Sequence, residues 1–172
     1  PELNELMAKV KASHGKMLEA KREELLEIVR QCAECGVVPA AFAAGVGSGA
    51  TLMGVSRRLK EHFPAVCCVA VEPAESPMLS QGRAGSHGIQ GIGANFVPGV
   101  FDHALADRIV TVSTGEAMHM SREMMRQEGL LCGITAGANV HAAVQLARMP
   151  EFSGRDFVTI YQSILQQNFG KV

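Results

Sequence analysis

Apolar residues follow two different periods along the chain, and the change between them divides it. From Pro1 to about Gly36 they recur every three or four positions, as at Leu3, Leu6 and Val10, which predicts amphipathic helix. Charged residues fill the remaining positions of this segment, and Gly36 is a typical helix stop. We therefore expect a helical segment over residues 1–36.

From residue 37 onward, short apolar runs alternate with helical patterns. Strands are predicted near residues 37–44, 66–71, 108–112 and 157–160, and helices near 51–62, after Ser113, and near 137–148. This alternation is typical of βαβ units, so residues 37–172 are predicted to form one α/β domain with a mostly parallel sheet. Residues 72–104 are rich in Gly, Pro and Ser and predict a long loop, which in a compact domain is usually functional.

A glycine-rich segment, residues 45–51 (GVGSGAT), joins the first predicted strand to the next helix. Such a turn presents backbone N–H groups at the positive end of a helix dipole, which suits an anionic phosphate. Read as G-x-G-x-x-A, it also matches the dinucleotide fingerprint, with Glu72 near the position of a ribose-binding acid. A turn without a ligand is the third interpretation, so the residues alone leave a phosphate cofactor, NAD and a plain turn open.

The amino-acid composition argues against several classes of binding partner. Sixteen Lys and Arg stand against seventeen Asp and Glu, and there is no Trp and one Tyr, which argues against nucleic acid. No apolar run reaches the roughly 20 residues that a membrane span needs, so no membrane association is expected. Five cysteines, an odd number, fit a reducing, cytoplasmic location better than a disulfide framework. The pair Cys32 and Cys35 has no second pair to complete a metal site, so none is expected.

Five motifs, in order between residues 37 and 160, resemble the cysteine synthase (O-acetylserine sulfhydrylase) family of fold-type II pyridoxal-phosphate-dependent enzymes, to which cystathionine β-synthase is also similar. They are residues 45–54 (GVGSGATLMG), 69–73 (VAVEP), 76–79 (SPML), 89–94 (IQGIGA) and 128–139 (EGLLCGITAGAN). The resemblance implies a three-layer α/β fold and pyridoxal 5′-phosphate as cofactor. It also implies a homodimer that acts on an amino acid, converting O-acetylserine and sulfide to cysteine and acetate by β-replacement.

The resemblance also assigns binding residues. The cofactor phosphate would be bound by a loop of five residues: Gly47, Ser48, Gly49, Ala50 and Thr51. Thr135 would contact the pyridine nitrogen, although its hydroxyl could instead cap the helix that follows. Gly91 and Gly93 would line the substrate side of the cofactor, or serve only as turn residues.

The family's Schiff-base lysine has no counterpart in this sequence, so no catalytic residue is assigned. None of the six lysines stands in the family's S-x-K-D/N-R context: Lys9, Lys11, Lys16, Lys21, Lys60 and Lys171. The family's loop for the substrate carboxylate is likewise unmatched. Our interpretation is that the chain corresponds to the C-terminal part of such an enzyme, binding the cofactor weakly and inactive alone. The alternative is a non-catalytic regulatory or interaction relative that keeps the fold.

Overall fold

A computed structural model of the chain describes Arg30, Cys32 and residues 34–160. Residues 1–37 and 38–172 form separate compact units, and the fold described below belongs to the second. The helix expected over residues 1–36 falls almost entirely outside the described residues. It stays a prediction.

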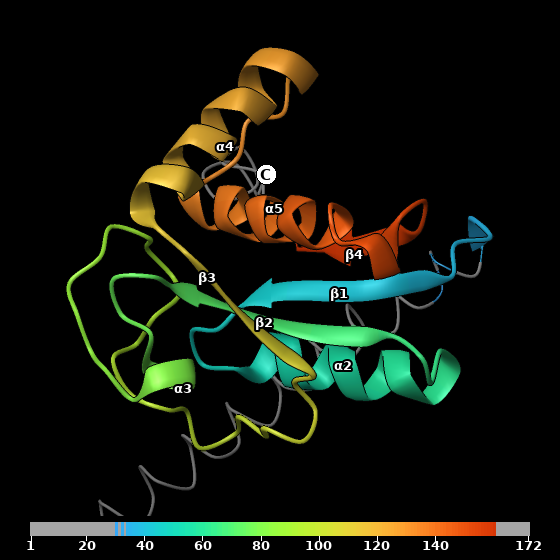
Figure 1. The fold of residues 1–172 in the computed structure, drawn as a ribbon, viewed down its shortest axis with the longest axis horizontal. Coiled ribbons are helices and arrows are strands. Elements are labelled where there is room, and N and C mark those ends of the chain that lie inside the picture. The colour runs from blue at the N-terminus through green and yellow to red at the C-terminus, as the bar shows by residue number, and fades with distance from the viewer. Residues whose placement is uncertain (1–29, 31, 33, 161–172) are drawn as a thin grey trace, which may run out of the picture. The chain divides into compact units, whose positions relative to one another are not determined.

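Four parallel strands form one sheet in the order β3-β2-β1-β4 (Figure 1). Their bounds are Pro39–Gly45 for β1, Cys67–Pro73 for β2, Arg108–Val112 for β3 and Asp156–Thr159 for β4. The chain moves from β1 outward to β2 and β3, and then returns to place β4 on the opposite side of β1. In such sheets ligands bind beyond the carboxyl ends of the strands where this order reverses, which here is between β1 and β4.

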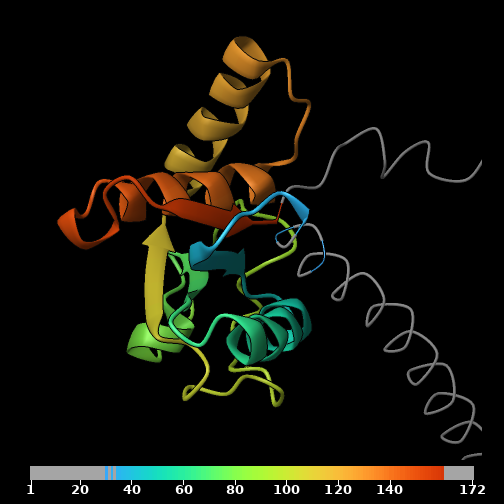
Figure 2. The same cartoon turned by 90° about the vertical axis from the view of Figure 1, so that its right-hand side faces the viewer.

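Helices cover both faces of the sheet, so the fold has three layers (Figures 1 and 2). Helix α2 (Ala50–His62) lies on one face and α5 (Ile134–Ala147) on the other, while α4 (Thr114–Glu128) packs on α5. The two central strands are almost entirely buried, as expected for strands covered on both sides. The predicted α/β class with a parallel sheet flanked by helices is confirmed.

The long loop predicted over residues 72–104 contains a short helix, α3 (Met78–Gln81). Its start is held by the buried carboxylate of Glu72, which accepts hydrogen bonds from Leu79 N–H at 2.7 Å and from Ser80 N–H at 3.1 Å. A four-residue helix is too short to show a helical period. The sequence pattern could therefore not reveal it.

The start of α4 is fixed by two carboxylates. Ser113 and Glu116 form a capping box, in which Ser113 N–H donates to the Glu116 carboxylate at 2.8 Å and Glu116 N–H donates to the Ser113 hydroxyl at 3.2 Å. Glu75 accepts from Thr114 N–H at 2.8 Å. The N–H groups of Ser113, Thr114 and Glu116 at this helix start are thus bonded to side chains of the protein itself.

This capping box predicts a stability difference that depends on pH. Hydrogen bonds from the Ser113 hydroxyl and N–H lower the pKa of the Glu116 carboxyl. The stabilisation is therefore present above the unfolded-state pKa, about 4.3, and is lost as the pH falls through the lower folded value. We expect Ser113→Ala to lower the free energy of unfolding by about 1 kcal/mol at neutral pH, and by less in acid.

Urea unfolding of the unaltered chain and of the Ser113→Ala variant, each at neutral and at acid pH, measures this difference. Replacement of the exposed Ser86 by Ala serves as the control and should leave the free energy of unfolding unchanged at either pH. An equal loss for Ser113→Ala at neutral and acid pH would show that the Glu116 carboxylate contributes nothing.

Candidate functional site

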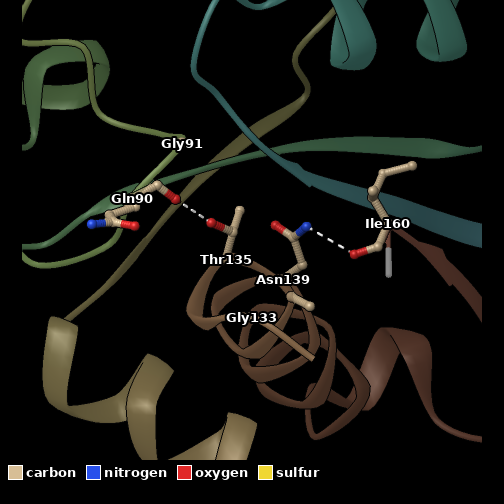
Figure 3. Close-up of a pocket in the computed structure, with 7 residues that line it drawn as sticks. Gln90, Gly91, Gly133, Thr135, Asn139 and Ile160 are labelled. Carbon is tan, nitrogen blue, oxygen red and sulfur yellow. Dashed lines mark hydrogen bonds between the residues drawn. The ribbon is translucent and has the colours of Figure 1, made fainter. Parts of the chain in front are cut away.

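A cavity of about 270 Å³ lies beyond the carboxyl ends of β1 and β4, where the strand order reverses (Figure 3). Seven residues line it: Gln90, Gly91, Gly133, Thr135, Ala136, Asn139 and Ile160. They come from the 90–91 turn, the start of α5 and the residue that follows β4. None of these side chains is ionisable, so the cavity offers hydrogen bonds and shape rather than charge.

Thr135 joins two walls of this cavity. Its hydroxyl donates a hydrogen bond to the backbone carbonyl of Gln90, which holds the 90–91 turn against the first turn of α5 (Figure 3). Gly91 has a φ of 93°, and a Cβ there would lie 3.4 Å from Thr135 Oγ1. Helix α5 begins at Ile134 with Gly133 at the N-cap, three residues earlier than predicted. The alternative that Thr135 caps this helix is therefore wrong.

The start of α2 is less fully capped than that of α4. Gly49 stands at its N-cap with a φ of 81° and has no side chain to cap the first turn, while Ala50 N–H donates a long hydrogen bond to the Ser48 hydroxyl at 3.5 Å. The helix dipole favours an anion at this helix start. Ala50 is not among the residues with positive φ, so its methyl group is compatible with the loop. Ser48 is exposed and Thr51 half-buried, which leaves both hydroxyls near the loop surface.

The glycine loop and the 90–93 turn meet through their backbones. A Cβ on Gly47 would lie 2.4 Å from the carbonyl oxygen of Gly91, so only glycine allows this approach. Gly93 N–H donates to the carbonyl of Val46 at 2.9 Å. The structure thus brings the predicted phosphate loop to the edge of the cavity that Gly91 and Thr135 line.

Gly93 is placed differently from Gly91. It is absent from the cavity lining, and its carbonyl lies 2.9 Å from Nε2 of His87, whose Nδ1 accepts from Ile89 N–H at 3.3 Å. Because Nδ1 accepts this hydrogen bond, the ring N–H lies at Nε2, which donates a hydrogen bond to the Gly93 carbonyl. The Gly93 backbone thus bonds to His87 and Val46 within the turn, and its place on the substrate side of the cofactor stays a prediction.

Sequence reasoning missed Asn139, which lies 2% exposed on the cavity wall. Its side chain accepts a hydrogen bond from Gly45 N–H at 2.8 Å. It donates another to the carbonyl of Ile160 at 3.0 Å, which Figure 3 shows. The signal that could have found it is its spacing, because Asn139 is one helical turn beyond Thr135 and therefore on the same side of α5.

Lys60, the lysine within residues 34–160, is far from the cavity along the sheet. Its ammonium group donates to Asp107 at 2.8 Å, and Asp107 also accepts from Cys68 N–H at the amino end of β2, at 2.7 Å. The hydrogen bond to Asp107 raises the pKa of Lys60. This lysine is therefore held protonated at the edge of the sheet opposite the cavity.

Other functional sites receive no support within the described part of the chain. Glu72, the candidate ribose-binding acid, is occupied in holding α3. No group of three or more metal-ligating side chains gathers anywhere in residues 34–160. Among the helices described there, none has the length and apolar character needed to cross a bilayer.

Comparison with known proteins gives consistent matches. Residues 12–163 match the family described as pyridoxal-phosphate dependent enzyme. The cysteine synthase of Staphylococcus aureus strain N315 is 45% identical over 123 residues, which cover 72% of this chain and 39% of that protein. Cysteine synthase B of Campylobacter jejuni is 49% identical over 107 residues, 62% of this chain and 36% of that protein.

Solved structures agree with these sequence matches. O-acetyl serine sulfhydrylase isoform 3 from Entamoeba histolytica superimposes with a TM-score of 0.80 at 32% identity, covering 90% of this chain and 45% of its own. The O-acetylserine dependent cystathionine beta-synthase from Helicobacter pylori gives 0.71 at 37% identity, covering 82% and 45%. The chain thus spans less than half the length of these relatives.

The contact between the two glycine turns predicts a steric effect. We expect Gly47→Ala to lower the free energy of unfolding by about 1–3 kcal/mol, because the added methyl group would force the Gly91 carbonyl away. Gly99→Ala is the matched control, since a Cβ there meets nothing within 4 Å and should change the free energy by less than about 0.5 kcal/mol. Equal effects in urea unfolding would contradict the close approach.

Proposed function

We propose, from the premise that the chain belongs to the family of pyridoxal-phosphate dependent enzymes, that residues 38–160 hold the cofactor of a cysteine synthase-like enzyme. The observation that carries this proposal is the glycine-lined start of α2, whose N-cap residue Gly49 has no capping side chain and which lies against the turn that lines the cavity. A phosphate and an attached ring need an anion site and an adjoining uncharged cavity, and the two features provide both.

The residues present fit the phosphate. The loop Gly47 to Thr51 offers backbone N–H groups at the start of α2, and its hydroxyls at Ser48 and Thr51 add possible donors. Gly47 leaves no room for a side chain beside Gly91, so the backbone itself forms the surface that faces a ligand. We assign the phosphate to these five residues, including Ala50.

Thr135 is the proposed contact of the ring nitrogen, and Gly91 the proposed neighbour of the substrate side. The hydroxyl proton of Thr135 is donated to the Gln90 carbonyl, so Thr135 offers a lone pair to a group in the cavity. Gly91 keeps the cavity open, because a side chain there would reach Thr135. Gly93 supports the same turn through its bonds to Val46 and His87.

The proposed activity of the whole enzyme is β-replacement, in which O-acetylserine and sulfide give cysteine and acetate. When bound, pyridoxal phosphate supplies the electron sink for this chemistry. The described residues would bind and orient that group, but they offer no amine at the cavity, because Lys60 is paired with Asp107 at the opposite edge of the sheet. We therefore propose that this chain binds the cofactor weakly and does not catalyse the replacement alone.

A cytoplasmic location and assembly as a homodimer, both expected from the sequence or the family resemblance, complete this proposal. Measurement of the molecular mass in solution tests the homodimer directly.

Binding of pyridoxal phosphate to the full chain, measured by equilibrium dialysis, tests the phosphate loop. We expect reversible binding that pyridoxal, which lacks the phosphate, does not reproduce. Thr51→Val should weaken it about tenfold, the effect of one hydrogen bond to a charged group. Thr111→Val, on strand β3, is the matched control and should leave binding unchanged.

Two results would contradict the proposal in different ways. Equal binding of pyridoxal and pyridoxal phosphate would refute the phosphate loop. Formation of a borohydride-reducible adduct on one of the six lysines, located by mass spectrometry, would refute the claim that the chain has no lysine for the cofactor.

A further inference from the structure

We propose that Asn139 is a positioning residue that separates β1 from β4 and thereby places the glycine loop against the cavity. The geometry of this claim concerns the protein alone, whereas its consequence for ligand affinity rests on the proposed function. Asn139 is buried, and none of the motif assignments made from the sequence gives it a role.

Strand β1 pairs with its two neighbours over different lengths. On one side, pairing with β2 continues to Gly45, opposite Val71. On the other side, pairing with β4 stops at Ala43, opposite Thr159. Beyond that point Gly45 N–H and the Ile160 carbonyl face the gap between the two strands, where a continued ladder would have paired backbone groups.

The Asn139 amide fills this gap. Its Oδ1 accepts from Gly45 N–H at 2.8 Å. Its Nδ2 donates to the Ile160 carbonyl at 3.0 Å, as Figure 3 shows. One partner is a donor and the other an acceptor, so only one orientation of the amide satisfies both. Asn139 thus acts as a spacer between the ends of β1 and β4, and the cavity lies beside it.

The position of Gly45 determines where the glycine loop begins. Gly45 is two residues before Gly47, whose backbone lies against Gly91, and Thr135 is one turn before Asn139 on the same helix. The Asn139–Gly45 bond therefore links the proposed phosphate site directly to the helix that carries the proposed ring contact. Its loss should move the loop relative to Thr135 without unfolding the domain.

Two replacements and one control test this role in the full 172-residue chain. Asn139→Leu keeps the branched shape of the side chain and its number of heavy atoms, although leucine is larger, and removes both hydrogen bonds. Asn139→Ala also removes both hydrogen bonds, but it leaves space that solvent from the cavity can fill. It therefore serves as the second test if the leucine variant does not fold. Ser121→Ala also removes one buried side-chain bond, from the Ser121 hydroxyl to the Cys132 carbonyl at 2.9 Å, but between α4 and the segment before α5.

Backbone amide spectra give the first readout, without any ligand. We expect the signals of Gly45, Gly47, Gly49 and Thr51 to move in both Asn139 variants and to stay in place in Ser121→Ala. A change confined to Gly45 in a folded Asn139 variant would overturn the proposal, because the loop would then be placed independently of Asn139.

Affinity for pyridoxine 5′-phosphate, which cannot attach to a lysine, gives the second readout. We expect the dissociation constant to rise at least about tenfold in the Asn139 variants and less than about twofold in Ser121→Ala. Equal weakening in all three variants would indicate a general loss of stability and overturn the positioning role. If the unaltered chain binds none, the proposed function fails, and the amide spectra still decide the role of Asn139.

Discussion

Strand β1 pairs two residues further with β2 than with β4, and the site depends on that inequality. It leaves a donor at Gly45 and an acceptor at Ile160 without ladder partners, and backbone groups that are partly removed from water in this way are stable when they find another partner. The side-chain amide of Asn139, on helix α5, forms hydrogen bonds with both groups. A hydrogen-bonding requirement of the backbone thus fixes the position of α5 and opens a cavity at the point where the strand order reverses.

Close backbone contact supplies the second half of the site. Gly47 lies so close to the Gly91 carbonyl that no side chain fits at position 47, and the Thr135 hydroxyl holds the second loop in place. The result is an anion-favouring helix start beside an uncharged cavity. Binding would therefore rely on N–H groups and shape, which are set by folding, rather than on side-chain charge.

The ionisable groups of the described residues lie away from the cavity, so the cavity can bind a ligand but offers no side chain to transfer a proton. Among the described residues, the cavity lining contains none, while Lys60 is held protonated by Asp107 at the far edge of the sheet. The chain matches 39% of the length of a Staphylococcus aureus cysteine synthase. The described residues thus form a site suited to positioning a group, not to moving its protons.

The sequence alone determined the α/β class, the four strands and the glycine loop, because burial on both faces and a strand-to-helix turn leave local patterns in the chain. It also carried the family resemblance, which the comparisons confirm, whereas the binding roles of Gly47 to Thr51, Thr135 and Gly91 stay predictions. Only the tertiary structure decided that Glu72 holds α3, that the Gly93 carbonyl bonds to His87 and that Asn139 bridges β1 and β4. Those outcomes depend on partners up to 94 residues away in the chain, and no local period records which partner a buried polar group will meet.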